Sequence, residues 1–235
     1  LPADLRHRAA DEQVLVSEDG DGAAIGVYLD EKLLERLAAA NPVDALHGGN
    51  LADFWTALEG VSHFTYLAWN TSHDRPVSLL ELELQAEVDK YVGSLWLLRS
   101  QQPARFPREL HHLLFERARV DDSLAGERVG LYHHANRYAA RFCRRLERAL
   151  SQKSAAVSAA TVGELRRFYR WSSARKCRHI EQLGPDRGQR LLVNPPVAGR
   201  HDRAALGRRT AAPGGDDAAR ALDDRDQRHD VVGLE

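Results

Sequence analysis

Apolar positions follow two different periods in the first part of the chain, which separates a hairpin from a series of helices. Residues 12–30 hold two short β-prone runs, Gln13–Val16 and Ile25–Leu29, on either side of a segment that contains Asp-Gly twice. Asp-Gly between two such runs is a strong signal for a hairpin turn. From Asp30 onward the apolar spacing becomes helical. The pattern therefore predicts an N-terminal β-hairpin over residues 12–30, followed by helices.

Five or six helices fit the pattern after the hairpin, with capping residues and prolines at their ends. The expected ranges are about 31–40, 51–69, 78–99, 108–120, 127–151 and 161–183. The helix over 78–99 has apolar residues on several faces, which is typical of the central helix of a bundle. Residues 152–160 are small and polar, and we expect a linker there. The sequence thus predicts a mainly α protein, in which residues 1–183 form one helical-bundle domain with the hairpin packed against it.

The last segment, residues 184–235, has a different composition. It contains no Phe, Trp or Tyr, and Leu, Ile and Val supply only 9 of its 52 residues. Such a segment cannot bury enough apolar surface to offset the entropy that ordering would cost. We therefore expect a disordered C-terminal tail.

Charge is unevenly distributed although the net charge is only -1. Residues 1–127 carry 22 acidic and 11 basic side chains, and residues 128–190 carry 4 acidic and 15 basic ones. An acidic first part and a basic middle part favour charge pairing within the chain or across a dimer. The alternative interpretation is that the basic helices, over 137–148 and 164–178, bind nucleic acid. Basic side chains can follow phosphates, and aromatic ones can stack on bases. The candidate contacts are Arg141, Arg144, Arg145, Arg166, Arg167, Arg170 and Lys176.

Glutamate and histidine residues beside apolar stripes form a second candidate site. Glu59 and His63 are four residues apart and share a helix face, and Glu87 flanks the stripe of the next helix. His134 flanks the apolar face of a later helix. Helical bundles bind metal through inward-facing Glu and His, so Glu59, His63, Glu87 and His134 are candidate ligands of a metal-dependent enzyme. The Glu-x-x-His repeat of di-iron bundles is missing, which favours a structural network instead. In that interpretation Glu59 pairs with His63, while Glu83, Glu87 and Lys90 lie at a solvated edge.

Motifs that would define an enzyme class are absent from the sequence. It contains no GxGxxG, GxxxxGK[ST], GxSxG or HExxH motif and no CxxC pair. The two cysteines, Cys143 and Cys177, are isolated, and no export signal or run of 18 apolar residues is recognisable. These features predict a soluble, cytoplasmic protein without a membrane partner.

Three functions are compatible with these patterns. We expect first a bacterial-type, non-enzymatic regulatory or scaffold protein without a cofactor, whose partner is another protein or a second copy of the chain. The alternatives are nucleic-acid binding through the basic helices and a metal-dependent helical-bundle enzyme. The absence of a strong motif leaves all three open.

Overall fold

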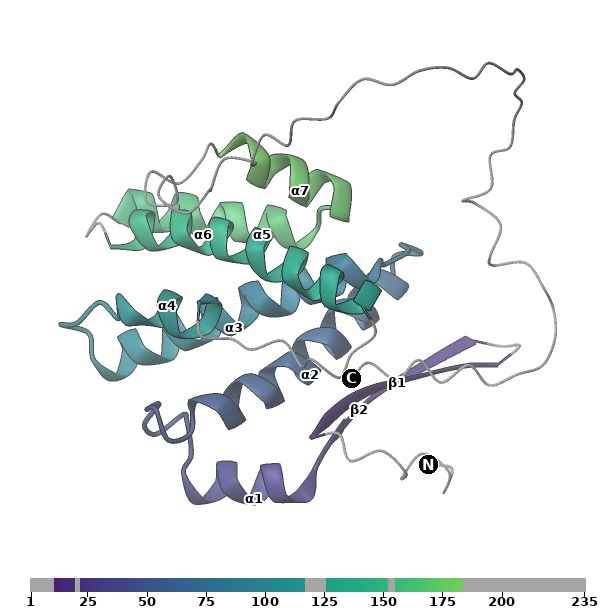
Figure 1. The fold of residues 1–235 in the computed structure, drawn as a ribbon, viewed down its shortest axis with the longest axis horizontal. Helices are drawn as coiled ribbons and strands as arrows, with labels where there is room; N and C mark the ends of the chain where they lie inside the picture. The colour runs from purple at the N-terminus through teal and green to yellow at the C-terminus, as the bar shows by residue number, and fades with distance from the viewer. Residues whose placement is uncertain (1–10, 20–21, 117–125, 152–154, 184–235) are drawn as a thin grey trace, which may run out of the picture. The chain divides into compact units, whose positions relative to one another are not determined.

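The computed structural model describes residues 11–19, 22–116, 126–151 and 155–183 (Figure 1). Within these ranges it confirms a mainly α fold with an N-terminal hairpin, whereas the predicted tail, 184–235, lies outside them. The elements are β1 (Glu12–Asp19), β2 (Gly22–Leu29), α1 (Glu31–Ala39), α2 (Leu51–Thr71), α3 (Leu79–Gln101), α4 (Glu109–Phe115), α5 (Gly126–Leu150), α6 (Ala155–Tyr169) and α7 (Ser173–Gln182). In this part of the chain, no helix is long and apolar enough to cross a membrane.

The hairpin packs on α2. Its strands are antiparallel, with Glu12 opposite Leu29 and Asp19 opposite Gly22, and both strands contact α2. A two-stranded hairpin is marginally stable alone in water, and here Val14 is buried against the helices. Glu12 lies two residues before Val14 and therefore belongs to the same inward face of β1.

Helices α2 and α3 are antiparallel. Trp55 donates from its indole nitrogen to Ser94 Oγ, and Tyr66, later in α2, donates to Glu81, at the start of α3. The order of contacts along one helix is thus reversed along the other. Ser78 caps α3 by accepting a hydrogen bond from the backbone N–H of Glu81, as the sequence spacing predicts.

Helix α3 is the centre of the bundle, since it contacts α2, α4 and α5 (Figure 1). Its buried side chains include Leu84, Val88 and Tyr91, as expected for a helix with apolar residues on several faces. On the other side of the core, the rings of Phe142 on α5 and Phe168 on α6 stack with their centroids 4.1 Å apart. The C-terminal helices are therefore joined to the same core.

The segment after α5 differs from the sequence-based expectation. Helix α6 begins at Ala155, inside the predicted linker, which agrees with the helix propensity of its alanines. Thr161 lies within α6 and does not cap a helix. The single helix predicted over 161–183 is interrupted at 170–172, where the chain turns and the backbone N–H of Ser173 donates to Glu81 Oε2.

Candidate metal centre

A cluster of charged side chains is enclosed between the hairpin, α2 and α3. Burial of such groups is costly unless they are paired or bound to a metal. Because Glu59 and His63 are one turn apart on α2, and Glu83 and Glu87 are one turn apart on α3, the two antiparallel helices present four polar groups to each other. The cluster consists of Glu12, Glu59, His63, Glu83, Glu87 and Lys90.

Three members of this cluster are arranged as metal ligands. Glu59, His63 and Glu83 each offer one ligand atom, and these atoms all lie within 4.8 Å of one another. His63 is only 1% exposed and Glu83 only 4%. The distance from His63 Nε2 to Glu83 Oε2 is 3.7 Å, too long for a hydrogen bond. Among the described residues, neither ring nitrogen of His63 has a hydrogen-bond partner, which is unusual for a buried imidazole.

Burial lowers the pKa of His63 to about 4, although the charge of Glu59 opposes this change. The imidazole is therefore neutral at physiological pH, which is the form that binds metal ions. Burial, together with the nearby charge of Glu59, raises the pKa of both Glu12 and Glu83 to about 8. Without a cation, these two carboxyl groups hold protons at neutral pH.

Lys90 is the resident positive charge of the cluster. Its Nζ lies 2.8 Å from Glu59 Oε2 and 2.6 Å from Glu87 Oε1. Burial lowers the pKa of Lys90, but these two carboxylates outweigh burial and raise it. One ammonium group does not satisfy the whole cluster, because Glu12 Oε2 and Glu87 Oε2 are buried without a partner among the residues described.

A glycine makes room for the hairpin at this position. A Cβ atom on Gly60 would lie 2.5 Å from Glu12 Oε2 and 3.2 Å from Val27 Cγ2. Gly60 therefore permits the close approach of both strands to α2, despite the cost of a glycine inside a helix. A glycine inside a helical pattern is a sequence signal of such an approach.

Sequence reasoning identified part of this site. Glu59, His63 and Glu87 belong to one cluster, but Glu83 and Lys90 are buried, so their predicted place at a solvated edge is wrong. His134 is exposed on α5, where its ring faces Tyr138 at 6.5 Å between centroids, and it does not belong to the group of three ligands. Glu12 was not recognised as a candidate, although its alternation with Val14 places it on the buried face of β1.

One candidate nucleic-acid contact, Lys176, lies in an environment that a phosphate-binding residue does not have. Lys176 is fully buried, and its Nζ donates to Tyr66 OH at 2.9 Å and to Gln85 Oε1 at 2.8 Å. A phosphate cannot reach it in this structure. Lys176 therefore differs from the exposed contact that the sequence suggested.

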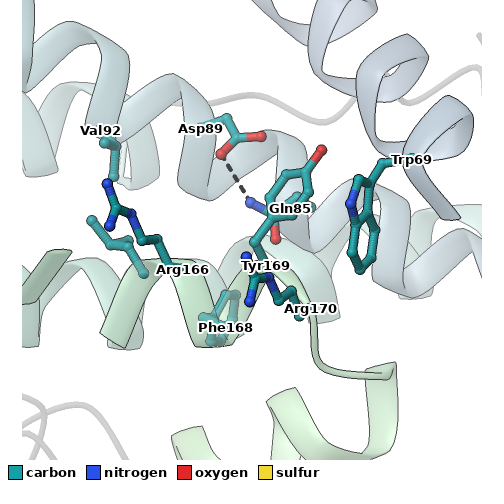
Figure 2. A pocket seen from close by; sticks show the side chains of 9 residues that line it. Trp69, Gln85, Asp89, Val92, Arg166, Phe168, Tyr169 and Arg170 are labelled. Carbon is teal, nitrogen blue, oxygen red and sulfur yellow. Dashed lines mark hydrogen bonds between the residues drawn. The ribbon is translucent and has the colours of Figure 1, made fainter. Parts of the chain in front are cut away.

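The candidate arginines of α5 form ion pairs and hydrogen bonds within the protein. Arg145 donates two hydrogen bonds to Glu164, at 3.1 and 2.9 Å. Arg144 pairs with Glu147 on its own helix and with Glu116 after α4, and Arg141 donates to the backbone oxygen of Glu181. By contrast, Arg166, Arg167 and Arg170 are exposed, and two of them, Arg166 and Arg170, line a pocket (Figure 2).

Comparisons with protein-family models, curated proteins and solved structures found no match.

Proposed function

We propose that this protein binds one divalent transition-metal ion through Glu59, His63 and Glu83, and that the metal fastens the hairpin to the helical bundle. The observation that carries the proposal is the environment of His63. Its imidazole is buried, both ring nitrogens lack a partner among the described residues, and two carboxylates are within ligand distance of each other and of the ring. A metal ion supplies the partner that a buried imidazole requires.

Charge balance supports a cation at this position. If ionised, Glu12, Glu59, Glu83 and Glu87 contribute four negative charges, which Lys90 reduces to three. Such an excess is costly in a buried site. A divalent ion leaves one negative charge and allows Glu12 and Glu83 to ionise. Its charge thereby opposes the burial and the charge of Glu59, which keep them protonated at neutral pH.

Ligand chemistry narrows the choice of metal. One imidazole nitrogen with carboxylate oxygens suits zinc, manganese and ferrous iron better than calcium or magnesium, whose sites are built from oxygen alone. Three protein ligands leave a fourth position of a tetrahedral site open. Glu12 is a candidate for it, because its unpartnered Oε2 lies over Gly60, next to Glu59 in the chain.

The position of the site favours a structural or regulatory metal over a catalytic one. Strands β1 and β2 pack directly on α2 beside the ligands, and the Glu12 side chain occupies the approach over Gly60. Metal binding would then stabilise the docked hairpin. Such a role is compatible with a non-enzymatic regulatory or scaffold protein, which remains a proposal together with its partner, but it departs from the expectation that the protein has no cofactor.

Metal titration of the full chain tests the proposal. Purified protein stripped with a chelator is titrated with zinc, manganese or ferrous iron while thermal unfolding is followed. We expect about one equivalent to bind and to stabilise the fold by about 2.7 kcal/mol at a hundredfold excess over Kd. His63→Ala should lose this gain, whereas the control His134→Ala should retain it. No stabilisation by any of the three metals, or equal losses in both variants, would contradict the proposal.

A further inference from the structure

A pocket of about 390 Å³ opens between α2, α3 and α6, away from the ligands of the proposed metal centre (Figure 2). Its volume is within the range of small-molecule sites in proteins. The residues that carry the argument are Trp69 from α2, Gln85 and Asp89 from α3, Arg166 and Tyr169 from α6, and Arg170 immediately after it.

Asp89 is held as a fixed hydrogen-bond acceptor in the pocket. Ser62 Oγ donates to its Oδ2 at 2.6 Å, and Gln85 Nε2 donates to its Oδ1 at 2.9 Å. Lys176 donates to Gln85 Oε1 from behind, which directs the amide nitrogen of Gln85 toward Asp89. A carboxylate has about four lone-pair sites, so Asp89 retains acceptor capacity for a ligand.

Aromatic side chains form one wall of the pocket. The rings of Trp69 and Tyr169 lie with centroids 5.7 Å apart, and in Figure 2 Trp69 stands at the side of the pocket opposite Arg166. Tyr169 also packs edge-on against Tyr66, at 5.0 Å between centroids, which fixes its position. The planes of Trp69 and Tyr169 are inclined at 65° to each other, so a planar heterocycle can stack on one ring while the other borders its edge.

Two arginines supply the positive charge. Arg166 and Arg170 are four residues apart and exposed, and no side-chain hydrogen bond or ion pair links either guanidinium group to another described residue. Guanidinium groups match phosphate oxygens in charge and geometry. Both arginines and Asp89 line the same pocket, so a single small ligand can contact the arginines with an anionic group and Asp89 with another group.

From this arrangement we propose that the pocket binds a nucleoside monophosphate whose base carries an exocyclic amino group. The phosphate binds Arg166 and Arg170, the base lies against Tyr169 and Trp69, and its amino group donates to Asp89. The proposal is independent of the metal centre, since none of these residues belongs to that cluster.

Calorimetric titration of the full chain with CMP and UMP tests the proposal, because the two ligands differ in an amino group at the position that Asp89 recognises. We expect CMP to bind about tenfold more tightly than UMP, the usual discrimination from one base-edge contact. Asp89→Asn should reduce this difference. Arg166→Ala should weaken CMP binding at least about tenfold, whereas Arg167→Ala is the matched control, since Arg167 is exposed on the same helix and does not line the pocket.

Titrations with an oligocytidylate strand and with inorganic phosphate show whether the pocket binds a free nucleotide or a nucleotide within a single strand. Tighter binding of the strand than of CMP, weakened by Arg166→Ala, would mean that the pocket holds a nucleotide within a single strand. CMP binding without this gain would identify the free nucleotide. The proposal would be overturned if neither CMP nor the strand bound, or if CMP and UMP bound equally. It would also be overturned if phosphate bound as tightly as CMP, or if Arg166→Ala and Arg167→Ala lost equal affinity.

Discussion

Replacing Glu83 by Gln should stabilise the metal-free protein and remove most of the stability that metal adds. Gln keeps the size of the side chain but cannot ionise, so it removes both the cost of keeping Glu83 protonated and an anionic metal ligand. Glu83 has a pKa of about 8 in the folded protein, against 4.5 as the ordinary value, because burial and the charge of Glu59 favour its protonated form.

The magnitude follows from this difference in pKa. In the metal-free protein, the folded state holds a proton that the unfolded state releases above pH 4.5. Stability is thus unaffected below pH 4.5, falls as the pH rises to about 8 and is constant above it. Each pH unit between 4.5 and 7 costs about 1.4 kcal/mol, so the total at pH 7 is about 3 kcal/mol. Metal-free Glu83→Gln should be more stable by up to this amount.

Urea denaturation of metal-free and metal-loaded protein at pH 5 and pH 7 provides the assay. Without metal, we expect the variant to exceed the parent protein by up to about 3 kcal/mol at pH 7 and by much less at pH 5. With excess metal, the parent protein should gain about 2.7 kcal/mol at a hundredfold excess over Kd, and the variant should gain little. A metal-free variant that is less stable at pH 7, or one that retains the full gain from metal, would refute the reasoning.

Three further changes test other parts of the account. Gly60→Ala should displace the Glu12 carboxyl group and weaken metal-induced stabilisation in thermal melts, whereas Gly163→Ala should not, because its nearest neighbour would be 3.7 Å from the new Cβ. Burial lowers the pKa of Lys176 to about 7, so the contribution of Lys176 to stability should rise between pH 7 and pH 10.5. Urea denaturation should show this rise in the parent protein and not in Lys176→Met. If DNA binds through the exposed arginines Arg166, Arg167 and Arg170, the log–log dependence of affinity on salt in anisotropy titrations should be no steeper than about -3, at roughly -0.9 per contact. A steeper slope would mean that other residues contact phosphate.

Local signals in the sequence were sufficient for the elements that short-range interactions determine. The paired Asp-Gly dipeptides predicted the hairpin, and Ser78 predicted the start of α3. Apolar residues on several faces also identified α3 as the central helix. The turn at 170–172 was not predictable in this way, since it accompanies a hydrogen bond from Ser173 to Glu81, 92 residues earlier in the chain.

For the candidate sites too, the sequence predicted only the groupings that arise from spacing along one helix. Spacing on one helix brought Glu59 and His63 together, but the burial of Lys90 and Lys176 depends on the helices that pack around them. The sequence pattern around Lys90 is that of a solvated lysine, whereas in the structure Lys90 pairs with two carboxylates, one of them on α2. Glu12 belongs to the cluster because Gly60 admits it, and that contact joins a strand to a helix far along the chain. Tertiary packing therefore decided which charges are buried.

X-ray absorption at the zinc edge of the loaded protein tests the central claim most directly. The account predicts a first shell of one imidazole nitrogen and carboxylate oxygens at about 2.0–2.2 Å, without sulfur. The imidazole signal should disappear in His63→Ala and persist in His134→Ala. A sulfur shell at about 2.3 Å would contradict the proposed metal centre, because it would place the metal on Cys143 or Cys177. An imidazole signal that survives His63→Ala would contradict it as well.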